Sequence, residues 1–113
     1  TAVANDIDYE SVFSLSIEKY GEKGDVLICV SSSGNSPNII KALEAAKKLG
    51  MITVSFVGFS GGKARDDSDY SIYIPIENYG VVEDTHHSLM HILSQYVRMK
   101  TLLVDEDLGK TVF

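Results

Sequence analysis

Two short, mainly apolar runs, separated by one helical pattern, constrain the fold of this chain more than any other feature. The first run is Val26–Val30 and the second is Met51–Val57. The first run has no polar residue, which is typical of a strand buried on both faces, as in a parallel sheet. We interpret the second run, which also contains Thr53 and Ser55, as a second buried strand. The segment between them begins at Ser36-Pro37, a helix N-cap followed by proline at the first helical position, and ends at Gly50. The sequence therefore predicts a strand–helix–strand unit with parallel strands.

The flanking segments extend this pattern in both directions. A helix is predicted over residues 9–20, with Asp8 as its N-cap, a third strand over 71–75, and a last helix over 82–100. This order predicts an α/β fold in which helices cover both faces of a parallel sheet, giving three layers. Three strands are few for such a sheet. We therefore expect further N-terminal strands, or a partner chain, to complete the core.

Composition narrows the possible functions. The 113 residues carry a formal net charge of −6, which argues against nucleic acid or an anionic membrane as a partner. The single cysteine, Cys29, lies inside the first apolar run and cannot form an internal disulfide, which favours a reducing compartment. The sequence contains no signal-peptide pattern and no apolar stretch of membrane-spanning length, so we expect a cytoplasmic protein. We interpret residues 1–100 as one domain and 101–113 as a C-terminal tail.

The segment between the first strand and its helix is a candidate anion site. It reads Ser-Ser-Ser-Gly-Asn-Ser over residues 31–36, at the edge of a parallel sheet where ligands bind. Backbone amides at a helix N-terminus lack partners and suit a phosphate, and Gly34 permits close approach. The alternative, a turn with a good N-cap, explains Ser36 and Pro37 but not the preceding serines. The candidate hydroxyl donors are Ser31, Ser32, Ser33 and Ser36.

Four segments in order, residues 4–13, 24–36, 58–63 and 83–91, resemble the SIS (sugar isomerase) domain family and its phosphoheptose isomerase-like members. The resemblance implies a flavodoxin-like, doubly wound parallel sheet and a homotetramer. It also implies isomerisation of sedoheptulose 7-phosphate to D-glycero-D-manno-heptose 7-phosphate, for heptose, lipopolysaccharide or capsule precursors. The N-terminal part of the family domain, with its Gly-rich loop and a further His and Glu, has no counterpart in the sequence. We therefore expect an incomplete site in this chain alone.

The resemblance also implies roles for individual residues. We call residues 31–36 the serine loop; in the family the matching loop holds the phosphate. Asn5 and Asp6 match a substrate-contacting Asn-Asp pair. His91 matches a histidine that is a zinc ligand and a candidate acid or base. Glu83 stands where the family usually has a metal-contacting glutamine, and a carboxylate is also a good zinc ligand. The resemblance thus implies one zinc ion per site, with Glu83 and His91 as its catalytic and metal-binding residues.

The spacing of these residues on the predicted helix can also be interpreted without the family resemblance. His87 and His91 are one turn apart and suit a shared metal, but we favour a solvated polar stripe for His87. Eight residues separate Glu83 from His91, about 12 Å along a helix. One metal reaches both only with long side-chain reach, a helix that starts after Glu83, or ligands from different subunits. His86 is expected at the surface or at an interface.

Two functions stay open from the sequence. The first is a sugar-phosphate isomerase. The second is a non-catalytic SIS module that binds a sugar phosphate, or a protein partner, as a regulator.

Overall fold

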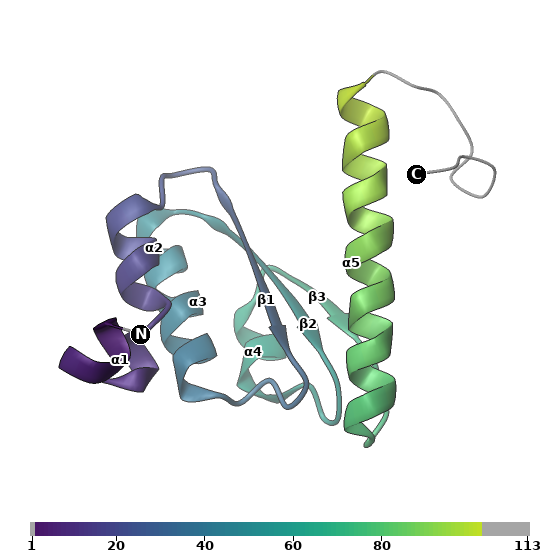
Figure 1. Ribbon diagram of the computed structural model, residues 1–113, viewed down its shortest axis with the longest axis horizontal. Coiled ribbons are helices and arrows are strands. Elements are labelled where there is room, and N and C mark those ends of the chain that lie inside the picture. The colour runs from purple at the N-terminus through teal and green to yellow at the C-terminus, as the bar shows by residue number, and fades with distance from the viewer. Residues whose placement is uncertain (1, 103–113) are drawn as a thin grey trace.

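The computed structural model describes residues 2–102, and these form a parallel sheet covered by helices (Figure 1). The strands are β1 (Val26–Ser31), β2 (Ile52–Val57) and β3 (Tyr70–Tyr73), hydrogen-bonded in the order β1-β2-β3. Both pairings are parallel, so the two predicted apolar runs are neighbouring strands. The predicted α/β fold class with a parallel sheet is confirmed.

Helices lie on both faces of this sheet. In Figure 1, α3 (Pro37–Leu49) and α4 (Gly62–Asp67) cover one face together with α2 (Ser14–Tyr20), and the long α5 (Tyr79–Thr101) stands on the other side. Residues 103–113 of the predicted tail lie outside the described residues. No helix among residues 2–102 combines the length and the apolar character needed to span a membrane. In chain order the helices are α1 (Ala2–Asp6), the 3-10 helix η1 (Tyr9–Ser11), α2 (Ser14–Tyr20), α3 (Pro37–Leu49), α4 (Gly62–Asp67) and α5 (Tyr79–Thr101).

The predicted helix over residues 9–20 is divided into η1 and α2. Asp8 caps it as expected, because its Oδ1 accepts a hydrogen bond of 2.7 Å from the Ser11 amide. The Ser11 hydroxyl donates to the other carboxylate oxygen at 3.0 Å, and the Ser14 hydroxyl donates to the Ser11 carbonyl at 3.4 Å. These short side chains satisfy backbone groups that a continuous helix would have paired, so the chain turns before α2 begins.

The face of the sheet under α3 is closely packed. Small residues of α3 allow the helix to approach, and Leu43 joins Cys29, Val57 and Ala64 in the buried core. The helix ends as predicted at Gly50, whose φ of 73° is the left-handed conformation that glycine adopts without a Cβ clash. The buried alanines of α3 are Ala42, Ala45 and Ala46.

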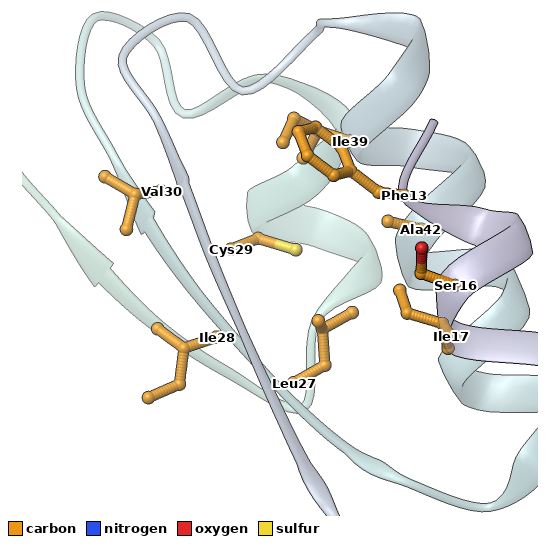
Figure 2. A pocket seen from close by; sticks show the side chains of 9 residues that line it. All are labelled: Phe13, Ser16, Ile17, Leu27, Ile28, Cys29, Val30, Ile39 and Ala42. Carbon is orange, nitrogen blue, oxygen red and sulfur yellow. The ribbon is translucent and has the colours of Figure 1, made fainter. Parts of the chain in front are cut away.

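The opposite face is covered less completely, which corrects the expectation that β1 is buried on both sides. Val26, Ile28 and Val30 stay 55%, 43% and 38% exposed, because β1 is an edge strand in the described chain. Their side chains alternate with Leu27 and Cys29, which Figure 2 shows pointing toward the helices. On the far side, an apolar cavity of about 390 Å³ lies between the sheet and α5.

A second apolar cavity lies on the helix side of β1 and is drawn in Figure 2. Phe13, Ser16 and Ile17, from α2 and the turn before it, face Leu27 and Cys29 of β1 across a space of about 380 Å³. Burial raises the pKa of the Cys29 thiol to about 11. The thiol is therefore protonated and unreactive at neutral pH, as expected of a structural cysteine.

The first turns of α5 are anchored on the end of β2. Val82 is fully buried against Gly58, where a Cβ would lie 2.5 Å from a Val82 methyl group. His86 is 2% exposed, with its ring centroid 6.2 Å from that of Phe56. The expectation that His86 lies at the surface or at an interface is therefore wrong: its ring is part of the contact between α5 and the sheet.

Candidate functional site

The serine loop lines a polar hollow at the carboxyl end of β1. The hollow measures about 420 Å³ and lies between the serine loop, the start of α3 and the first turns of α5. Its apolar wall includes Phe13, Val30 and Ile39, which also line the cavity of Figure 2, so the two spaces share a wall. All four serines that the sequence singled out line the hollow: Ser31, Ser32, Ser33 and Ser36.

The loop is folded so that its hydroxyls keep their protons available. The Gly34 amide donates to the Ser31 hydroxyl oxygen at 3.2 Å, and the Asn35 amide donates to that of Ser33 at 3.3 Å. Each hydroxyl acts there as an acceptor, so its own hydrogen is free to donate to a ligand. Ser36 is the N-cap residue of α3 but makes no side-chain cap hydrogen bond. Its hydroxyl is available in the same way.

Two backbone amides of the loop add to this donor set. Within the described part of the chain, the amides of Ser33 and Ser36 donate to no protein acceptor. They stand before α3, whose 13 residues direct a partial positive charge toward the loop. The amides of Gly34 and Asn35, in contrast, are used by the serine hydroxyls. The loop therefore combines hydroxyl donors, free amides and a helix N-terminus around one hollow, which is the chemistry that holds a phosphate.

The loop after β2, residues 58–62, braces the serine loop from behind; we call it the glycine loop. The Gly58 amide donates to the Ser32 carbonyl at 2.8 Å, and the Ala64 amide donates to the Gly34 carbonyl at 2.8 Å. Gly34 has a φ of 66° and lies so close that a Cβ there would clash with the Gly61 carbonyl. The side chain of Asn35 accepts a 2.9 Å hydrogen bond from the Lys63 amide. The serine loop thus has one shape, set by its neighbour.

Lys63 itself does not line the hollow. Its ammonium group lies 3.3 Å from Glu44 and 3.7 Å from Asp67, in two exposed ion pairs. Lys63 is therefore a solvated residue at the start of α4.

On the opposite wall, α5 contributes Tyr79 and Glu83. They are one turn apart, so both side chains lie on the same helix face. The helix begins at Tyr79, where Asn78 caps it by accepting a 3.1 Å hydrogen bond from the Val81 amide. Glu83 therefore stands inside α5, and the option of a helix that starts after Glu83 is excluded. The position of Tyr79 on this wall is a structural finding that no sequence pattern predicts.

His91 lies two turns further along α5, exposed and outside the hollow. The axial separation from Glu83 is about 12 Å, too far for one metal ion to bind both side chains directly. Among residues 2–102 no group of three His, Cys, Asp or Glu side chains could hold a metal ion. The described residues therefore do not fit a zinc site by themselves. His87 is exposed as well, which agrees with a solvated stripe.

Asn5 and Asp6 end the short helix α1 and are exposed. Neither residue lines the serine hollow. Their role in binding substrate stays a prediction.

His86 could have been placed from the sequence. Leu89 and Leu93 belong to the apolar side of the last helix, and steps of three and four residues backward reach His86 and Val82. Burial lowers the pKa of His86; the nearby Val57 carbonyl and Glu83 carboxylate oppose this lowering. Neither ring nitrogen is in hydrogen-bonding geometry with a protein atom. Burial of the ring therefore favours its neutral form.

The chain is similar to known proteins over most of its length. Residues 1–58 match the SIS domain family. A phosphoheptose isomerase of Fusobacterium nucleatum is 44% identical over 97 residues, which cover 86% of this chain and 50% of that protein. A phosphoheptose isomerase of Helicobacter pylori is 46% identical over 93 residues, which cover 82% of this chain and 48% of that protein. The chain thus spans about half the length of these relatives.

Solved structures give the same picture. The phosphoheptose isomerase of Neisseria gonorrhoeae superimposes with a TM-score of 0.81 at 32% identity, covering 85% of this chain and 55% of the other. That of Francisella tularensis gives a TM-score of 0.78 at 28% identity, covering 81% and 50%.

Proposed function

The chain belongs to the SIS domain family, and from this we infer that the protein that carries it is a sugar-phosphate isomerase. The proposed reaction converts sedoheptulose 7-phosphate to D-glycero-D-manno-heptose 7-phosphate, for heptose, lipopolysaccharide or capsule precursors. The observation that carries the proposal is the serine hollow, which gathers anion donors opposite a carboxylate, Glu83. The relatives named phosphoheptose isomerase support the choice of substrate. A cytoplasmic homotetramer is part of the same proposal.

In this proposal the serine loop grips the phosphate of the substrate. Hydrogen bonds from the hydroxyls of Ser31, Ser32, Ser33 and Ser36, with the free amides of Ser33 and Ser36, fix the phosphate end. Binding energy from this remote group orients the carbons that react, because the phosphate itself does not change in the reaction. The sugar then extends across the hollow toward α5.

The reaction moves a proton between adjacent carbons through an enediol-like intermediate. A carboxylate or a histidine can accept and return that proton. Glu83 lines the hollow and is the proposed proton carrier among the described residues, or a metal ligand in place of the family's glutamine. His91 keeps its proposed role as zinc ligand and acid or base on the family match alone. Asn5 and Asp6 keep their proposed contact with substrate on the same basis.

Zinc is proposed only with further ligands. Glu83 and His91 of one chain are too far apart to share an ion, so they could bind the same zinc only from different subunits, and the further ligands must come from outside residues 2–102. A bound zinc ion would polarise the substrate carbonyl.

The test uses the complete natural protein that contains these residues. With sedoheptulose 7-phosphate and zinc we expect turnover, and His91→Ala lowers kcat by on the order of 10²–10⁴-fold. His87→Ala is the matched control, one turn away on the same helix, and should keep kcat within about twofold of the unmodified protein.

Other results would change the conclusion. Unchanged turnover in His91→Ala removes His91 from the mechanism. Phosphate binding without turnover in the unmodified protein favours the second function, a regulatory SIS module that binds a sugar phosphate.

A further inference from the structure

Phe59, in the glycine loop, has an unusual backbone conformation. Its φ is 50°, and among residues 2–102 it is the one non-glycine residue with a positive φ. A bulky residue rarely adopts this conformation, because its Cβ crowds the backbone. Such strain persists only where the surrounding structure holds it, and it is concentrated at functional sites. Contacts around Phe59 must therefore hold it in this conformation.

Backbone and ring contacts hold Phe59 in place. Its amide donates to the Ile76 carbonyl at 3.2 Å, and its carbonyl accepts a 2.7 Å hydrogen bond from the Tyr73 hydroxyl. Its ring contacts that of Tyr79, with centroids 4.6 Å apart and planes tilted by 53°. The ring of Phe59 is thus directed at the first residue of α5, a favourable arrangement for aromatic pairs.

Through Tyr79 this contact reaches the serine hollow. Tyr79 and Glu83 both line the hollow and share one face of α5. Between them Val82 is buried against Gly58, the residue before Phe59. The same loop also fixes the opposite wall, since the Gly58 amide donates to the Ser32 carbonyl. The glycine loop therefore touches both walls of the hollow, and Phe59 is its contact with the α5 wall.

We propose that Phe59 is a positioning residue that sets the distance between the serine loop and Glu83 by holding Tyr79. This inference rests on the proposed function. A sugar phosphate has a fixed length from its phosphate to its reacting carbons, so the separation of the two walls decides whether Glu83 meets them. Loss of the Phe59 ring lets the start of α5 move, while the serine loop keeps its own hydrogen bonds. The reaction then slows although the phosphate still binds.

The test compares Phe59→Gly with Phe59→Tyr in the complete natural protein. Glycine removes the ring and accepts a φ of 50°, so the fold is not strained further. We expect kcat to fall by on the order of ten- to hundredfold in Phe59→Gly, with the dissociation constant for inorganic phosphate within about twofold. Phe59→Tyr keeps the ring and should keep kcat close to that of the unmodified protein. An unchanged kcat in Phe59→Gly, or phosphate binding that weakens in parallel with kcat, overturns the inference.

A second measurement separates this inference from the proposed function. Amide hydrogen exchange over residues 79–86 should be faster in Phe59→Gly. It should be unchanged in Tyr20→Ala, which removes a 72% exposed ring from α2. If the unmodified protein has no isomerase activity, the proposed function fails, but faster exchange still supports the role of Phe59. Unchanged exchange in Phe59→Gly overturns that role whatever the activity.

Discussion

The serine loop and the glycine loop occupy equivalent places but have different tasks. Each follows a strand of the same parallel sheet and leads into a helix. The serine loop gathers hydroxyls before a helix of 13 residues, whereas the glycine loop leads through Gly61, at a φ of 91°, into a helix of six that begins at Gly62, at a φ of 58°. The topology therefore provides two positions where an anion could bind, and the serine loop is the one whose side chains can hold it.

The use of the helix N-termini explains why. The first amides of α4 are already occupied, because those of Lys63 and Ala64 donate to Asn35 and Gly34 of the serine loop. A helix end whose donors are satisfied by protein has little left for a ligand. At α3, by contrast, the amide of the cap residue Ser36 has no protein acceptor in the described chain. The N-terminus of α4 therefore holds the serine loop in shape, and the N-terminus of α3 is left to bind an anion.

The largest effect is expected from filling the contact between the two loops. In Gly34→Ala the new methyl group would clash with the Gly61 carbonyl, at a φ of 66°. We expect a loss of roughly 2–5 kcal/mol in unfolding free energy, from overpacking plus the left-handed backbone, and loss of phosphate binding. Urea unfolding and phosphate titration measure both.

Gly24→Ala is the matched control, because its φ is 94° but no atom lies within 4 Å of the new Cβ. It should cost only roughly 1–2 kcal/mol, from the backbone alone. Equal losses in the two variants would mean that the close approach of the loops is unimportant.

The next effect tests the difference in side chains. Ser33→Ala removes a hydroxyl from the hollow, and Ser60→Ala removes one from the glycine loop. A hydrogen bond to a charged group contributes about 1.5–3 kcal/mol, so phosphate should bind about ten- to hundredfold more weakly to Ser33→Ala. Ser60→Ala should bind it normally. Isothermal titration with inorganic phosphate measures both affinities. A similar loss in both variants would contradict the distinction drawn between the loops.

A smaller effect is expected on the unfolding free energy at acidic pH, because protonation of His86 weakens the packing of α5 rather than the serine loop. The pKa of His86 is lowered by burial, so the unfolded chain takes up a proton before the folded one does as the pH falls below about 6.5. The stability linked to His86 is complete above that pH and is lost as the pH falls through the pKa of the folded state. Unfolding free energies measured between pH 7.5 and 5 should show this decline.

His86→Leu should flatten that pH dependence. His87→Leu, which changes the exposed neighbour, should leave it as it is. If both variants keep the same slope, the decline comes from other groups.

The smallest effect is expected at Lys63. Its two ion pairs are exposed and worth about 0.2–1 kcal/mol at most, and its ammonium group faces Glu44 and Asp67 rather than the hollow. Lys63→Met should therefore change phosphate affinity by less than about twofold. A loss of tenfold or more would mean that the glycine loop shares directly in binding the anion.

Much of the architecture could be read from local patterns. The apolar runs, Ser36-Pro37 and Gly50 placed β1, α3 and β2 within a residue of their observed bounds. The exposure of Ile28 could not be read in this way, since it depends on which strand lies at the edge of the sheet. An edge position is a property of the whole assembly of strands and leaves no mark in a five-residue window.

The candidate site also combines features set by local sequence with features set by the packing of distant segments. The serine loop is local and was found as a motif, because its residues are consecutive. Tyr79 and Phe59 meet only through the packing of α5 on the end of β2, and neither residue type announces that contact. The prediction for His86 is wrong because a polar residue type favours the surface, whereas its position on the apolar stripe of the helix places it in the core.

The buried thiol beside β1 has a practical consequence. Cys29 is the single cysteine of the chain and borders the apolar cavity that shares a wall with the serine hollow. With its pKa raised to about 11, it resists alkylation for as long as α2 stays closed over it. Any event that lifts α2 from the strand uncovers this sulfur to solvent and to reagents. The rate at which a maleimide labels Cys29 therefore reports how often α2 moves away from the strand.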